Sequence, residues 1–227
     1  MTAAEASPMG QPIQRLPQSE QDPGQRAADR ALLLGRIALG LAHDGKNPLH
    51  NMVLHLQLMQ EKVGTTPVDK HIAAMREGIG KIDHLLKAFG ELAAPEHLPP
   101  DLAAAAQRAQ LLLGFDARRA GAQLSLEAPQ SLMVVSDSRY LGDLVAHAVL
   151  ACISMARDGG RVTLKVELRG AIAALDVRVD EGLGTREQAL PHIEAARRMA
   201  GDAACELAVE TPAQGGARLS LSFLHPR

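Results

Sequence analysis

The segment covering residues 41–49 places several reactive side chains within two helical turns. His43 is followed directly by Asp44, and Lys46 and Asn47 come one turn later. Imidazole suits phosphoryl relay because it is nucleophilic near neutral pH and its N-phosphate is a high-energy donor. A neighbouring carboxylate can orient or deprotonate the ring, and the lysine lies near enough to help neutralise a phosphate.

The same segment is costly to keep in a helix. Proline costs about 3 kcal/mol in a helix interior, and glycine adds roughly 1 kcal/mol. Pro48 and Gly45 both fall inside a stretch of helical apolar periodicity. We therefore expect a role other than stability to keep these residues here. The alternative is that His43 is an ordinary surface or core histidine beside solvated charges.

Residues 43–49, HDGKNPL, resemble the phospho-acceptor box of sensor histidine kinases, written H-[E/D]-x-x-N-P-L. The resemblance implies that His43 carries the phosphoryl group and that Asp44 assists the ring, as the acidic neighbour does in the family. It also implies that Asn47 can orient a water for dephosphorylating the partner aspartate. Gly45 departs from the family's branched apolar residue and leaves room for a partner to approach.

Apolar periodicity predicts one helix over residues 25–63, bent near Pro48, and a second helix that ends near Pro95. Gly64 to Pro67 is the expected turn between them. One antiparallel hairpin cannot cover its own apolar stripe on both sides. We therefore expect a homodimer through residues 25–95, paired as a four-helix bundle. Residues 1–24, rich in proline, form a mobile leader.

The pattern changes after a proline-rich link at residues 95–100. We expect helices over residues 101–114, 137–156 and 186–200, and strands over 123–127, 132–136, 162–168, 173–180, 206–211 and 217–223. This order predicts a mixed sheet covered by helices on one face. The fold class is then α+β, a helical hairpin followed by an α/β sandwich over residues 100–227.

This order of elements resembles the catalytic core of histidine kinases, a dimerisation hairpin followed by an ATP-binding sandwich of the GHKL type. Three short strings match: DGGR at 158–161, DEGLG at 180–184 (the family's D-x-G-x-G), and GGAR at 215–218. The resemblance implies a nucleotide site at Asp180, Gly182 and Gly184, in which the aspartate reads the adenine amine.

Two departures from the family make that nucleotide site vestigial. The asparagines that hold Mg²⁺ in the family align with Ala151 and His147, and neither offers an amide oxygen to a hard cation. No glycine lies between Gly184 and Gly201, so the phosphate-cradling loop and lid look deleted. Phosphoryl transfer depends on such electrostatic partners. We therefore expect no autophosphorylation from ATP.

Composition excludes several other classes. A net charge of -2 and an aromatic share of 2% argue against nucleic-acid binding. Cys152 and Cys205 are too few for a disulfide framework or a zinc site, so no metal of its own is expected. The sequence shows no signal peptide and no apolar run long enough for a membrane span. A cytoplasmic location is the simplest expectation.

These observations predict a histidine phosphotransferase, similar to the kinase-derived phosphotransferases of phosphorelays. His43 would take a phosphoryl group from one response-regulator receiver domain and pass it to another. No cofactor is expected on this chain, and Mg²⁺ would come with the receiver. The alternatives are a divergent sensor histidine kinase that autophosphorylates on His43, and a non-catalytic adaptor or phosphatase that docks a response regulator.

Overall fold

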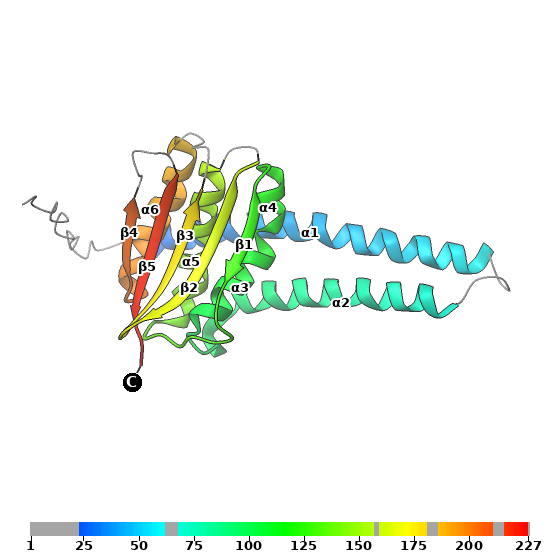
Figure 1. Ribbon diagram of the computed structural model, residues 1–227, viewed down its shortest axis with the longest axis horizontal. Coiled ribbons are helices and arrows are strands. Elements are labelled where there is room, and N and C mark those ends of the chain that lie inside the picture. Colours follow the sequence, from blue (N-terminus) through cyan, green and yellow to red (C-terminus); the bar gives the residue numbers. More distant parts are fainter. Residues whose placement is uncertain (1–22, 62–67, 157–158, 181–185, 211–215, 227) are drawn as a thin grey trace, which may run out of the picture.

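The computed structural model describes residues 23–61, 68–156, 159–180, 186–210 and 216–226. Helices α1 (Pro23–Glu61) and α2 (Val68–Ala93) form an antiparallel hairpin, and Pro48 lies inside α1. The N-terminal part of α1 lies along an α/β domain, while the rest of the hairpin projects away from it (Figure 1). The described part of the chain contains no helix both long and apolar enough to span a membrane.

The α/β domain contains the remaining elements. These are η1 (Pro95–His97), α3 (Leu102–Leu112), α4 (Gly114–Arg119), β1 (Gln123–Glu127), α5 (Ser138–Met155), β2 (Arg161–Arg169), β3 (Ile172–Val179), α6 (Arg186–Asp202), β4 (Glu206–Glu210) and β5 (Ala217–Leu224). The strands form one sheet in the order β1-β2-β3-β5-β4. The β1–β2 pair is parallel and the other pairs are antiparallel, so the sheet is mixed.

The helices that pack on the sheet lie on one face of it (Figure 1). Alternation along the strands creates this face: in β5, Leu219 and Leu221 are fully buried while Ser220 and Ser222 point the other way. Helix α5 is buried along most of its length because it packs on the sheet and also contacts α3 and α6. Asp137 caps its first turn by accepting a hydrogen bond from the backbone N–H of Arg139.

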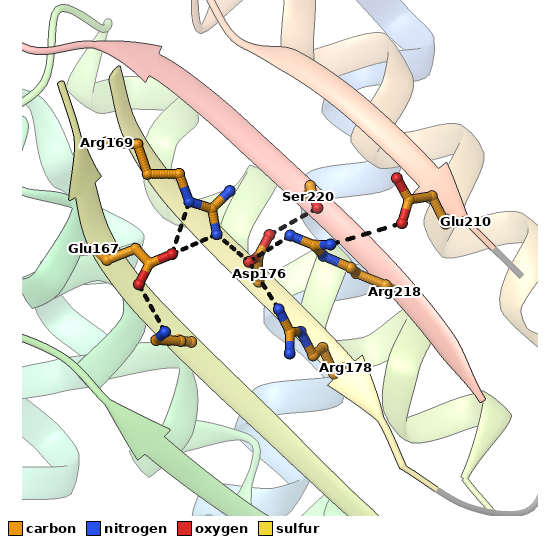
Figure 2. Close-up of polar contacts among 8 residues, drawn as sticks. Glu167, Arg169, Asp176, Arg178, Glu210, Arg218 and Ser220 are labelled. Atoms are coloured by element: carbon orange, nitrogen blue, oxygen red, sulfur yellow. Dashed lines mark hydrogen bonds and ion pairs between the residues drawn. The ribbon is translucent and has the colours of Figure 1, made fainter. Parts of the chain in front are cut away.

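Charged side chains occupy the other face of the sheet (Figure 2). Asp176 of β3 lies at the centre, surrounded by the guanidinium groups of Arg169, Arg178 and Arg218. The hydroxyl of Ser220 also donates to this carboxylate, at 2.7 Å. The network joins β2, β3 and β5 on the side that the helices leave open.

The α+β class, with a helical hairpin before a mixed sheet, is confirmed, and most of the expected helices and strands are present. The strand expected over residues 132–136 is wrong. Met133 makes only an isolated antiparallel bridge with Asp101. The Asp101 carboxylate, which also caps the first turn of α3, accepts the backbone N–H of Leu132, so a side chain satisfies a group that a strand partner would otherwise bind.

A second correction concerns the helix expected over residues 101–114. It ends at Leu112, and the short helix α4 follows from Gly114 to Arg119. Of the expected GGAR string, Gly216 is described and has a φ of 90°. A Cβ there would lie 2.7 Å from the carbonyl oxygen of Val179, so glycine is required at this turn into β5. The expected leader spans residues 1–24, but Pro23 and Gly24 belong to α1. Residues 1–22 and the expected turn at 64–67 lie outside the described residues.

Candidate functional site

His43 lies on α1 near the point where this helix leaves the α/β domain. Its side chain is 56% exposed, and Nδ1 is 3.3 Å from Oδ1 of Asp44. Lys46 and Asn47 are exposed on the same helix. Together with His50 and Asn51, these residues line a hollow of about 460 Å³. The structure thus places the four expected site residues of the box together and leaves the imidazole accessible to a large partner.

Helix α4 of the α/β domain packs against this box. Nη2 of Arg118 lies 2.5 Å from both carboxylate oxygens of Asp44. The ring of Phe115 is tilted against the His43 ring, with centroids 4.5 Å apart. A Cβ at Gly40 would lie 3.3 Å from Phe115, so a glycine on α1 lets α4 approach closely. The sequence did not reveal these contacts, because Arg118 and Asp44 are 74 residues apart and no local pattern links them.

A larger cleft opens on the other side of Asp44. It has a volume of about 830 Å³ and lies between the hairpin and the α3–α4–β1 region. Its polar lining consists of Asp44, Asn47, Asn51, Lys81, His84, Gln110, Arg118 and Gln123. A cleft of this size can admit a side chain or a small ligand. Asn47 and Asn51 line both hollows, so the box lies between two accessible surfaces.

Ion pairs fix the N-terminal half of α1 on the α/β domain. Arg30 pairs with the buried carboxylate of Asp143, and Arg36 lies 2.6 Å from Asp116. Asp29 accepts from Arg198 at 2.9 Å. Burial raises the pKa of Asp143 to about 6, although the charge of Arg30 opposes the shift. These pairs hold the helix that carries His43 in a defined position.

The region expected to bind nucleotide has different chemistry. Ala151 is fully buried, and its methyl group offers no ligand to Mg²⁺. The His147 ring, also buried, lies with Nδ1 3.2 Å from Nδ1 of His192 on α6, and helices α5 and α6 pack directly against each other. Asp180 is exposed just after β3, while Gly182 and Gly184 lie outside the described residues. Neither Ala151 nor His147 therefore offers an oxygen ligand to Mg²⁺.

Burial lowers the pKa of both His147 and the partly buried His192 to about 4. The charge of His192 adds to the effect on His147, and that of Arg36 adds to the effect on His192. Both rings are therefore neutral at neutral pH. Among the described residues, no group of three or more histidine, cysteine or carboxylate side chains is arranged to hold a metal ion.

The chain is similar to known signalling proteins. It is 30% identical over 133 residues to the two-component sensor PprA of Pseudomonas aeruginosa, and the match covers 55% of this chain and 14% of that protein. The chain therefore spans about a seventh of the length of this curated relative. It matches no model of a known protein family.

The solved structures similar to this chain include a bacterial phosphotransferase, with a TM-score of 0.48, 14% identity, and coverage of 84% of this chain and 96% of that one. They also include the mycobacterial sensor histidine kinase MprB, with a TM-score of 0.46, 19% identity, and coverage of 57% and 97%. The sequence match to a two-component sensor and the HDGKNPL box together make this chain similar to histidine-kinase-like proteins of two-component systems.

Proposed function

We propose that this protein is a histidine phosphotransferase of a two-component phosphorelay and works without ATP. His43 takes a phosphoryl group from the aspartate of one receiver domain and passes it to another. One contrast supports the proposal: the imidazole of His43 is accessible beside Asp44, whereas Ala151 and His147, which align with the family's Mg²⁺-binding asparagines, are buried and carry no amide oxygen.

The geometry around His43 supports a simple transfer step. When Nδ1–H donates to Asp44, the lone pair of Nε2 is left to attack phosphorus. The P–O bond of the aspartyl phosphate breaks as the P–N bond forms, and the aspartate carboxylate leaves with the electron pair. The reverse step delivers the group to a second receiver, and Mg²⁺ on that receiver neutralises the charge.

The partners proposed are a receiver domain and a second copy of this chain. Several large apolar side chains of the hairpin are about half exposed, namely Leu49, Val53, Leu56, Val68, Ile79 and Leu86. Exposed apolar surface of this extent is typical of an interaction site. A second hairpin packed on this stripe would complete a four-helix bundle and present two copies of His43.

The proposal is tested in two steps with the whole chain. Wild type, His43→Gln and His50→Gln are first incubated with γ-labelled ATP and Mg²⁺, and then with a labelled phosphorylated receiver domain. We expect no label from ATP on any variant, and acid-labile label from the receiver on wild type and His50→Gln only. His50 is the matched control because it lines the same hollow.

Each of the other outcomes would indicate a different function. Acid-labile label from ATP that requires His43 would show a histidine kinase. Loss of phosphate from the receiver without label on His43 would show a phosphatase, for which Asp44 and Asn47 are suitably placed. Receiver binding with neither result would show an adaptor. Any of the three would overturn the phosphotransferase proposal.

A further inference from the structure

Arg118 brings a cation from the α/β domain to the phospho-acceptor box on the hairpin. Its Nη2 makes both contacts with Asp44, whose Oδ1 also faces Nδ1 of His43. The Asp44 side chain is 16% exposed, while that of Arg118 is 61% exposed. The guanidinium therefore covers the carboxylate and still presents a large part of its surface to solvent.

The Arg118 guanidinium has N–H donors that Asp44 does not use. Within the described part of the chain, Arg118 has no side-chain hydrogen bond other than the two to Asp44, and these leave Nε and Nη1 available. A planar guanidinium with several donors matches the oxygens of a phosphoryl group. A Cβ at Gly114 would lie 3.3 Å from Nη1, so the glycine leaves room on that side.

A tether between the hairpin and the α/β domain does not by itself explain this arginine. Arg30, Arg36 and Arg198 already tie α1 to the domain, and each pairs with a buried carboxylate. An exposed pair adds little to such an attachment, typically less than about 1 kcal/mol. Arg118 differs from these tethers in its position, because the Asp44 carboxylate that it contacts also faces the ring of His43.

We infer that Arg118 is a phosphoryl-binding residue of the acceptor site, supplied by the α/β domain. This inference rests on the proposed function. In the resting protein Arg118 holds Asp44. When His43 receives a phosphoryl group, with about two negative charges, the guanidinium turns to its oxygens. It then neutralises the repulsion between phosphate and the Asp44 carboxylate.

The transfer itself is the exchange described above, in which the P–O bond to the receiver aspartate breaks as the P–N bond forms. Arg118 gains and loses no proton, because a guanidinium stays charged throughout. Its effect is electrostatic and favours the state in which His43 carries the group. Removing it should therefore slow transfer to His43 and shift the equilibrium back toward the receiver.

The experiment measures transfer from a labelled phosphorylated receiver to the full chain at saturating receiver concentration. We expect Arg118→Ala to lower the transfer rate and the labelled fraction by about tenfold or more, and Arg118→Lys to recover part of this loss. Arg119→Ala is the matched control, because Arg119 is the next residue of α4 and is also exposed. It should stay within about twofold of wild type. Thermal unfolding of each variant reports folding separately.

A double variant separates phosphoryl binding from mere positioning of Asp44. In an Asp44→Asn background, Arg118→Ala should still lower transfer, because the guanidinium acts on the phosphoryl group itself. Loss of the effect in this background, or wild-type transfer by Arg118→Ala, would overturn the inference and leave the phosphotransferase proposal standing. Absence of label on wild type would instead refute the proposed function, and the inference with it.

Discussion

His147 and His192 form a partly buried pair between α5 and α6, in the region where the resemblance to histidine kinases predicts a nucleotide site. Their Nδ1 atoms are 3.2 Å apart, so one ring donates a hydrogen bond and the other accepts it. Arg36 reaches His192 Nε2 at 3.1 Å, while Asp29 and Arg198 lie near His147. A neutral pair fits the contacts of the two Nδ1 atoms and of His192 Nε2, while Nε2 of His147 is buried with no hydrogen-bond partner among the described residues. A protonated pair would place a cation beside arginines.

The pair predicts a pH dependence of stability. Burial lowers each histidine pKa from 6.5 to about 4, so between these values the unfolded chain binds more protons than the folded one. The free energy of unfolding should therefore fall as pH falls from 6.5 to 4, by on the order of 1–3 kcal/mol per histidine. Urea unfolding at several pH values measures this slope.

Asp143 acts in the opposite direction, because its raised pKa of about 6 makes the folded state take up a proton as pH falls. Variants therefore isolate the histidine contribution. His147→Gln should flatten the slope between pH 6.5 and 4, while His84→Gln, an exposed histidine on α2, should leave it unchanged. An unchanged slope in His147→Gln would contradict the assignment.

At the scale of elements, one carboxylate joins three strands on the open face of the sheet (Figure 2). Asp176 of β3 accepts from Arg169 of β2, and from Arg218 and Ser220 of β5. Burial alone would raise the pKa of Asp176, but these hydrogen bonds outweigh it and lower the pKa to about 2. The network therefore links three neighbouring strands through side chains on this face of the sheet.

Asp176→Asn should lower the free energy of unfolding at pH 7 by about 1–3 kcal/mol, because the arginines lose their shared anion but remain partly hydrated. Its wild-type contribution is present above pH 3.8 and is lost as pH falls toward 2. Glu210→Gln is the control, since this exposed glutamate lies 3.8 Å from Arg218. Equal stability of the two variants in thermal and urea unfolding would show that the network is not a stabilising centre.

At the scale of the whole molecule, the hairpin and the α/β domain have different packing. Ion pairs and the Phe115 contact hold the first half of α1 on the domain. The projecting half of the hairpin buries few large side chains and exposes an apolar stripe (Figure 1). The partner proposed for this stripe is a second copy of the chain, because two hairpins would bury it symmetrically.

The proposed dimerisation through this stripe can be tested at Val53 and Ile79, because both side chains are more than half exposed in the single chain. Val53→Glu and Ile79→Glu should each shift the protein from dimer to monomer at micromolar concentration, because burying an unpaired carboxylate is costly. Light scattering coupled to size exclusion measures the mass. Leu168→Glu, on the sheet away from the hairpin, should stay dimeric. If Val53→Glu and Ile79→Glu both remain dimeric, the interface lies elsewhere.

The sequence by itself determined the elements and the position of the acceptor box. Helical periodicity located the hairpin, alternation located strands such as β1 over Gln123–Glu127, and Asp137 marked the start of α5. These signals are local, since each depends on neighbours within a few residues. The placement of His43, Asp44, Lys46 and Asn47 on one helix follows from the same periodicity.

Only the tertiary structure decided which distant residues meet at the site. The contact of Arg118 with Asp44, the packing of Phe115 on Gly40, and the His147–His192 pair each join segments far apart in the chain. The segment at residues 132–136 is a short apolar run that favours a strand, but it is irregular in the structure, where an aspartate side chain satisfies part of its backbone. Local propensity does not predict such partners, because these contacts form only when distant segments of the chain pack together.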